Sequence, residues 1–176
     1  MHARKLLRLG LAGLALGAAS HAMAQVFVED PDWKEMDVPS APSFNKDKLI
    51  PVEMPSYVSL RFGVDPATLT LTHDGVIRYV MVAQSNGSSS GGGTLSAMYE
   101  GIRCAAGEFK TYARFSASGQ WAPVSNPQWR PLNDNNTSKH ALALARQGAC
   151  DGRSAMARSV QAIVSALKNP PKSPSQ

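Results

Sequence analysis

The chain has 176 residues, of which 43% are hydrophobic and 18% are charged, and its formal net charge is +5. This length suits one domain with a hydrophobic core, and the sequence contains no internal repeat. A membrane-spanning helix needs about 20 consecutive apolar residues. No stretch reaches that length, so the composition excludes a transmembrane segment.

The first 24 residues have the three parts of a cleavable signal peptide. Basic residues come first, an apolar stretch follows over residues 9–19, and Ala22-Met23-Ala24 supplies the small side chains that signal peptidase requires. We therefore predict Sec-type export, cleavage between Ala24 and Gln25, and a periplasmic location.

Cleavage changes the charge balance of the chain. It removes three of the 18 basic residues and no acidic residue, which leaves 15 basic against 13 acidic side chains, a net charge of +2. Residues 25–60 carry seven acids and three bases, whereas residues 61–176 carry twelve bases and six acids. Export excludes nucleic acid as a partner of this basic region, so we expect an anionic envelope component or another envelope protein. The alternative is that the bases only form a solvated surface.

Composition divides the exported chain into three parts. Residues 25–56 contain five prolines, many charges and little periodicity, which predicts a Pro-rich acidic leader that lies extended on the domain or is disordered. Residues 57–168 predict a single domain. Residues 169–176, Asn-Pro-Pro-Lys-Ser-Pro-Ser-Gln, predict a disordered tail.

In the first part of the domain, hydrophobic residues recur at every second position. Hydrophobic residues alternate with polar ones over residues 57–62 and 68–72, which predicts half-buried strands with Leu60 and Phe62 on the buried face. His73-Asp74-Gly75 predicts a tight turn, because glycine accepts a positive φ without steric cost. Residues 76–83 are mainly apolar on both faces of the strand that they would form, which predicts a central strand.

The rest of the domain predicts further strands and then helices. Residues 95–104 and 109–115 are strand candidates, and Ser118-Gly119 predicts a turn before Trp121, which together make an antiparallel meander of about five strands. An Ala-rich helix is predicted over residues 138–148. A helical stripe follows and ends before Pro170; its members are Met156, Val160, Ile163, Val164 and Leu167. Strands followed by helices predict an α+β fold with one or two C-terminal helices packed on one sheet face.

Several short motifs follow one another in the order found in a known family. They are Asp74-Gly75-Val76-Ile77-Arg78-Tyr79, Tyr99-Glu100-Gly101-Ile102-Arg103-Cys104, Glu108-Phe109-Lys110, Tyr112-Ala113, Trp121, Trp129 and Cys150. Through these motifs residues 57–165 resemble the cryptic neisserial protein family, which consists of exported proteobacterial proteins. The loop at residues 84–94 looks longer and richer in Gly and Ser than the family pattern. The resemblance implies an envelope protein without an established activity, and it supplies no catalytic residue.

Aromatic and charged residues of the inner strands and the following loop form the candidate ligand site. They are Tyr99, Glu100, Arg103, Trp121, Trp129 and Arg130. Such a mixture can stack on a sugar ring or hold an anionic group. The structural alternative is that the tryptophans fill the core and that Glu100 pairs with Arg103 or Arg130 to hold strand to loop.

We expect a non-enzymatic binding or interaction module of the cell envelope. The enzymatic alternative is a glycosidase-like hydrolase that uses Glu100 and Glu108, the only acids in or beside the inner strands, and it requires the two carboxyls to face each other within about 10 Å. We assign no catalytic residue, cofactor or metal. The exported chain has only two His and two Cys, which is a poor set of metal ligands.

Cys104 and Cys150 are the only cysteines, and we predict that they form a disulfide. An exported chain folds in an oxidising compartment, where such a pair persists as a bridge. A redox enzyme instead needs two thiols close in sequence at a helix start, and these cysteines are far apart. Two free buried thiols are the alternative.

Overall fold

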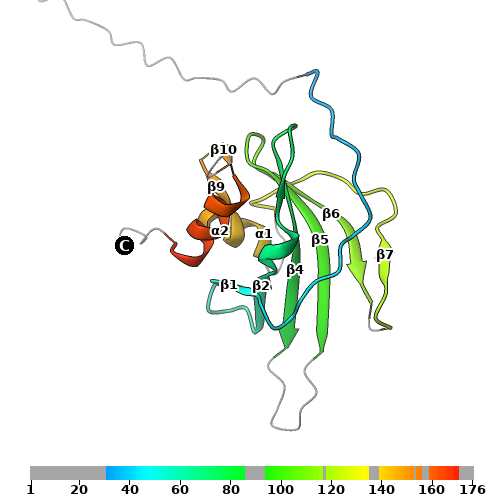
Figure 1. The fold of residues 1–176 in the computed structure, drawn as a ribbon, viewed down its shortest axis with the longest axis vertical. Helices are drawn as coiled ribbons and strands as arrows, with labels where there is room; N and C mark the ends of the chain where they lie inside the picture. The colour runs from blue at the N-terminus through cyan, green and yellow to red at the C-terminus, as the bar shows by residue number, and fades with distance from the viewer. Residues whose placement is uncertain are drawn as a thin grey trace, which may run out of the picture.

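Within the part of the chain that the structure describes, an eight-stranded antiparallel sheet organises the fold (Figure 1). The structure, a computed structural model, describes residues 31–85, 94–116, 118–134, 139–152, 154–155 and 159–170. The predicted signal peptide with its cleavage site, most of the Gly/Ser-rich loop and the last six residues of the predicted tail lie outside the described residues.

The sheet has the order β1-β2-β4-β5-β6-β7, with β3 paired to β4 and β8 paired to β6. Its strands are β1 (Ile50–Val52), β2 (Leu60–Val64), β3 (Thr70–Leu71), β4 (Val76–Ser85), β5 (Leu95–Arg103), β6 (Glu108–Phe115), β7 (Trp121–Pro123) and β8 (Arg130–Pro131). A separate ladder pairs β9 (Cys150–Asp151) with β10 (Ser154–Ala155). The predicted meander is confirmed. The additional strands are only two or three residues long, too short for an alternating pattern to be visible in the sequence.

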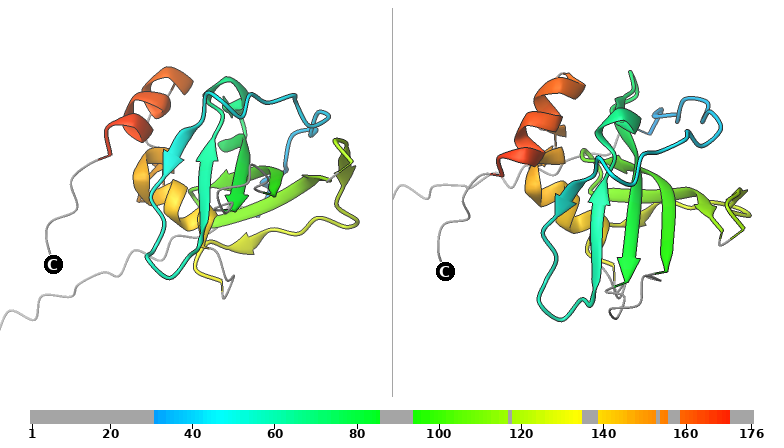
Figure 2. Two further views of the ribbon diagram at one scale, coloured as in Figure 1. Left: turned by 90° about the horizontal axis from the view of Figure 1, so that it is seen from below. Right: turned by 60° about the horizontal axis from the view of Figure 1, so that its bottom comes forward.

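The helical layer lies on one face of the sheet, as predicted (Figures 1 and 2). A 3₁₀ turn (Pro66–Thr68) precedes it in the chain, and the layer itself consists of α1 (His140–Leu144), a π-helical turn (Ala145–Ala149) and α2 (Val160–Lys168). The Ser159 hydroxyl caps α2 by accepting from the Ala162 amide. Gly148 has a φ of +150°, and a Cβ there would lie 2.9 Å from the Ala166 backbone, so only glycine lets the two helical segments approach this closely.

Strand β4 is buried on both faces, which confirms its predicted central place. Ile77, Tyr79 and Met81 pack among the helices, whereas Val80 and Val82 belong to a second apolar cluster on the other face. Strand β2 differs from its prediction: Leu60 is 38% exposed, and the buried part of the strand begins at Phe62.

The second face of the sheet is covered by residues 31–49, which we call the leader segment (Figure 2). Its apolar residues Ala41, Phe44 and Leu49 pack on the second cluster. The leader segment then continues into β1, which pairs with β2, so the sheet begins within the range predicted as leader. The hydrophobic face of an otherwise polar segment is therefore part of the folded domain.

A disulfide joins Cys104 to Cys150, as predicted, with an S–S distance of 1.98 Å. It links the end of β5 to the start of β9, directly after the π-helical turn. Disulfides persist in oxidising compartments, so this bridge indicates an extracytoplasmic location. Among the described helices, none is long and apolar enough to cross a membrane.

Reduction of this disulfide should lower the free energy of unfolding. The bridge spans 46 positions, and closing a loop of that length restricts the unfolded chain by about 4 kcal/mol in the entropic model. Urea denaturation of oxidised protein, reduced protein and the Cys104→Ser/Cys150→Ser variant measures the difference. Thiol titration of denatured, unreduced protein should find no free thiol; two reactive thiols would contradict the bridge.

Candidate functional site

The sheet face beneath the leader segment carries three basic side chains, which we call the cationic face: Arg78 of β4, Arg103 of β5 and Lys110 of β6. Arg78 and Arg103 are only 3% and 7% exposed. A buried cation is costly unless it is paired and hydrogen-bonded. The leader segment supplies many of the required partners.

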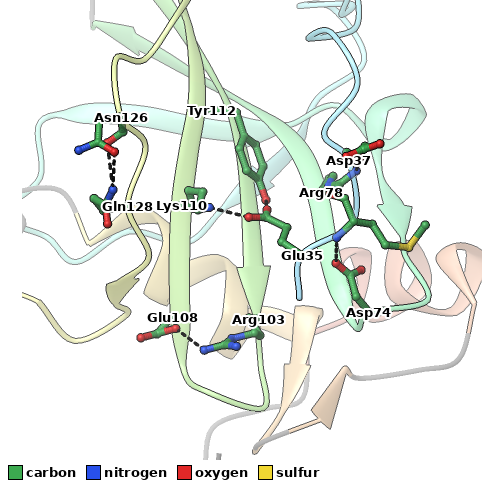
Figure 3. A network of polar contacts seen from close by, with 11 residues as sticks. Glu35, Asp37, Asp74, Arg78, Arg103, Glu108, Lys110, Tyr112, Asn126 and Gln128 are labelled. Atoms are coloured by element: carbon green, nitrogen blue, oxygen red, sulfur yellow. Dashed lines mark hydrogen bonds and ion pairs between the residues drawn. The ribbon is translucent and has the colours of Figure 1, made fainter. Parts of the chain in front are cut away.

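Arg78 holds the main chain of the leader segment. Its two terminal nitrogens donate to the carbonyl oxygens of Met36 at 2.7 Å and Asp37 at 3.0 Å (Figure 3). Asp74, in the turn before β4, accepts from the Met36 amide at 2.8 Å. Burial alone would raise the pKa of Asp74, but hydrogen bonds from Thr72 and Met36 outweigh burial and lower it. Both contacts recognise backbone groups, which any sequence would present.

The Glu35 carboxylate is held by two side chains of β6 (Figure 3). It accepts from the Tyr112 hydroxyl at 2.7 Å and from Lys110 Nζ at 2.5 Å. The Glu35 and Lys110 side chains are only 16% and 12% exposed, so water screens the pair little. Burial and then the adjacent Glu35 carboxylate raise the pKa of Tyr112, which keeps its hydroxyl protonated as the donor.

Two indole rings flank the third cation. The Arg103 guanidinium lies 4.0 Å from the Trp33 ring centroid and 5.7 Å from that of Trp129, and it forms a 2.8 Å ion pair with Glu108. The two rings meet edge to face at 5.8 Å. The Trp33 indole also donates to the Asp74 carbonyl. Such cation–π contacts strengthen when they are desolvated, so Trp33 anchors the start of the leader segment.

A β-bulge in β6 keeps Tyr112 and its neighbour Ala113 on the same, leader-facing side of the sheet. The ladder between β5 and β6 shifts between Tyr99 and Glu100, so Tyr112 is the extra residue between partnered Thr111 and Ala113. Thr111 then points to the helices, and Tyr112 and Ala113 both point to the leader side. A Cβ on Gly101 would collide with the Tyr112 hydroxyl. The glycine therefore makes room for the ring that holds Glu35.

An aromatic pocket lies where the other end of the leader segment meets β6 and β7. Phe44 contacts Phe115 and Trp121 edge to face, at centroid distances of 5.1 and 5.9 Å, and Trp121 donates its indole N–H to the Pro42 carbonyl. The pocket has a volume of about 720 Å³. Its remaining lining comprises Ser43, Asn45, Lys46, Asp47, Leu95 and Gly119. Half-buried rings beside polar side chains of a turn are suited to a ligand with an apolar body and polar edges.

On the helix side of the sheet, Glu100 is fully buried at the centre of a polar cluster. It accepts from Tyr79 at 3.1 Å and Thr111 at 2.9 Å, and His140 Nε2 lies 2.9 Å away. Burial favours neutral forms, but the two charges outweigh it: the Glu100 pKa is lowered and the His140 pKa is raised. The His140 ring also stacks on Phe62 at 5.3 Å. Below the raised pKa of His140, the two side chains therefore form an imidazolium–carboxylate ion pair within the core.

The structure separates the six predicted site residues into four places. Arg103 and Trp129 meet on the cationic face, and Tyr99 is buried on the same side against Tyr112. Trp121 lines the aromatic pocket. Arg130 forms an exposed pair with Asp134 after β8, and Glu100 faces the helices.

Glu100 thus pairs with His140. The structural alternative stated above, in which Glu100 pairs with Arg103 or Arg130, was wrong. The reason is alternation along β5, which sends Glu100 and Arg103 to opposite faces of the sheet. Glu108 lies with Arg103 on the cationic face. The two carboxylates therefore do not form the facing pair that a glycosidase needs.

Sequence reasoning missed the leader's contribution to both places. The sequence left open whether the segment with Trp33, Glu35 and Phe44 lies extended on the domain or is disordered, and it assigned no role to Arg78. Two signals were present in the sequence. Large aromatic residues in a Pro-rich polar segment indicate docking, and an arginine inside a strand that is apolar on both faces needs a partner from elsewhere.

The Glu100–His140 pair predicts a bell-shaped dependence of stability on pH. Because the folded-state pKa of Glu100 is lowered, its contribution is present above about pH 4.5 and is lost as the pH falls further. Because that of His140 is raised, its contribution is present below about pH 6.5 and is lost at higher pH.

Glu100→Gln should therefore lower the free energy of unfolding by about 2 kcal/mol, the scale of a hydrogen bond to a charged group. Urea denaturation of both proteins should show the largest difference between about pH 4.5 and 6.5. A difference that does not vary between about pH 3 and about pH 9 would show that the ion pair does not contribute.

Comparisons with known proteins give one match. No curated protein and no solved structure matches the chain. The model of the CNP1-like family, named for cryptic neisserial protein 1, matches residues 28–168. The match spans the leader segment, the sheet and both helices, so it includes every residue of the cationic face and the aromatic pocket. The predicted resemblance is confirmed, and the chain belongs to the CNP1-like family.

Proposed function

We propose that this chain is an exported periplasmic binding module that holds a sugar-containing envelope component in its aromatic pocket. The signal-peptide pattern of residues 1–24 and the Cys104–Cys150 disulfide support the location. The observation that carries the binding function is the combination of three half-buried rings with a polar turn around one pocket.

The size and lining of the pocket support a small ligand. Its volume of about 720 Å³ lies in the range of roughly 300–1,000 Å³ that ligand sites occupy. The hydrogen bond from Trp121 to the Pro42 carbonyl fixes the indole, and the edge-to-face contacts fix the neighbouring phenyl rings. A prearranged aromatic site avoids part of the entropy cost of binding.

A sugar ring matches both halves of this lining. Its C–H faces pack on aromatic rings, and its hydroxyls bond to polar side chains at the ring edge. Asn45, Lys46 and Asp47 supply such groups from one turn. Lys46 and Asp47 pair with each other and are 61% and 75% exposed, so both remain accessible to a ligand. The envelope offers two sources of sugar, peptidoglycan and lipopolysaccharide.

Another hollow supports this function less well. It has a volume of about 500 Å³ beside α1 and is lined by Tyr57, Lys139 and Arg146, among others. The Lys139 ammonium is already bonded to the carbonyls of Asn133 and Asp134, and the hollow has one aromatic ring rather than three. The hydrolase alternative has no supporting observation, because Glu100 is buried in the core and Glu108 is paired with Arg103.

The proposal predicts that Trp121→Ala weakens sugar binding. Titration with the peptidoglycan disaccharide of N-acetylglucosamine and N-acetylmuramic acid, and separately with a lipopolysaccharide core oligosaccharide, is followed by tryptophan fluorescence and calorimetry. At least one sugar should bind, and Trp121→Ala should weaken it about tenfold, which corresponds to about 1.4 kcal/mol.

The matched control is Tyr57→Ala, which removes an exposed aromatic ring from the hollow beside α1, away from the leader segment and the pocket. It should leave sugar affinity unchanged. Binding of neither sugar by the wild-type chain, or an equal loss in both variants, would contradict a sugar site in this pocket.

A further inference from the structure

The leader segment is bound to the sheet in the manner of a docked peptide. None of residues 31–49 belongs to a helix or to a strand of the sheet. The segment is held by side-chain anchors at its two ends, Trp33 and Phe44, and by the carboxylate of Glu35 between them. Arg78 and Asp74 hold its main chain. Anchor side chains combined with backbone contacts are how proteins recognise extended peptides.

Charge on the cationic face favours an acidic segment. The strands and turns beneath it supply Arg78, Arg103 and Lys110 against Asp74 and Glu108. The Glu35 carboxylate is the third anion, and it reaches the face from the leader segment. Lys110 and Tyr112 form a seat for one carboxylate, which the sheet itself does not fill.

The face also has hydrogen-bonding capacity that the leader segment leaves unused. Within the described part of the chain, the buried Trp129 indole N–H and Arg78 Nε have no acceptor. Buried donors normally find a partner. Both donors belong to side chains of the cationic face or its flank, so a segment with acceptors beside the carboxylate would bond to more groups than the leader segment does.

We propose that the cationic face is a binding groove for an extended acidic segment of another envelope protein, and that the leader segment occupies it as an internal copy of that ligand. The recognised pattern is an aromatic residue two positions before a carboxylate, as in Trp33-Lys34-Glu35. The aromatic residue lies against the Arg103 guanidinium and the Trp129 ring, and the carboxylate bonds to Lys110 and Tyr112. This groove is separate from the proposed sugar pocket.

A labelled peptide with the sequence of residues 31–44 tests the groove. It is added to the full exported chain, either wild type or with Trp33→Ala/Glu35→Ala, which removes the internal anchors and keeps the groove. In the wild-type chain the leader segment competes with the peptide, so the apparent affinity is the intrinsic affinity multiplied by the fraction of grooves that are open. The variant has no such competitor, and it should bind the peptide about tenfold more tightly than wild type. Fluorescence anisotropy measures both affinities.

Two controls identify the groove as the place of binding. A peptide in which Ala replaces the residues equivalent to Trp33 and Glu35 should bind neither protein. In the variant background, Lys110→Ala should abolish peptide binding, whereas Lys168→Ala, which removes an exposed lysine of α2 on the helix side, should not. Equal binding of both peptides, or retained binding with Lys110→Ala, would overturn the proposal.

A measurement on the wild-type chain keeps the test independent of the variant's folding. With isotopically labelled protein and unlabelled peptide, the amide signal of Met36, which is bonded to Asp74, should change as the leader segment is displaced. The proposal of a binding groove would be overturned if the Met36 signal did not change at a saturating peptide concentration and the folded variant did not bind the peptide. If the variant, whose groove is open, instead forms a dimer with the wild-type chain, which keeps the Trp33 and Glu35 anchors, the occupant is a second copy of this chain and the proposal of a separate partner is overturned.

Discussion

Each face of the central sheet carries an apolar cluster, and the rest of the structure depends on the need to cover both clusters. Antiparallel sheets commonly leave one face to solvent. Here β4 is buried on each side, with Tyr79 towards the helices and Val80 towards the leader segment. Burial contributes about 25 cal/mol for each Å² of apolar surface. The helices cover only one face, so a Pro-rich segment with few apolar residues of its own is ordered on the other.

The helices and the leader segment, which cover the two faces of the sheet, are held by buried charges as well as by apolar contacts. On the helix side, Glu100 of β5 binds His140 of α1. On the leader side, Lys110 of β6 binds the carboxylate of Glu35. A buried charge tolerates few substitutes, because removing its partner leaves an uncompensated ion. These two side-chain pairs therefore specify which segments lie over the strands, and in which register.

The leader segment contributes to both proposed binding places, which links them. Phe44 forms a wall of the aromatic pocket, and Glu35 fills the carboxylate seat of the cationic face. A ligand in the pocket would stabilise the docked leader segment, and an acidic peptide on the cationic face would displace it. Two ligands that favour different states of one element oppose each other's binding. On the proposed functions, this protein would hold either its sugar ligand or its protein partner.

The amino-acid sequence by itself determined the features that depend on near neighbours. An apolar run located β4, strand-like hydrophobic segments located β5 and β6, glycine marked the turn at Gly75, and the helical stripe located α2, because each depends on residues close together in the sequence. The export predicted from the first 24 residues and the presence of only two cysteines predicted the disulfide. Tertiary structure alone decided that Glu100 binds His140, that Trp121 and Trp129 lie in different places, and that the leader segment is docked. The contact of Glu100 with His140 joins residues 40 positions apart, and that of Glu35 with Tyr112 joins residues 77 positions apart. Both contacts depend on strand order and pairing, which local patterns do not encode.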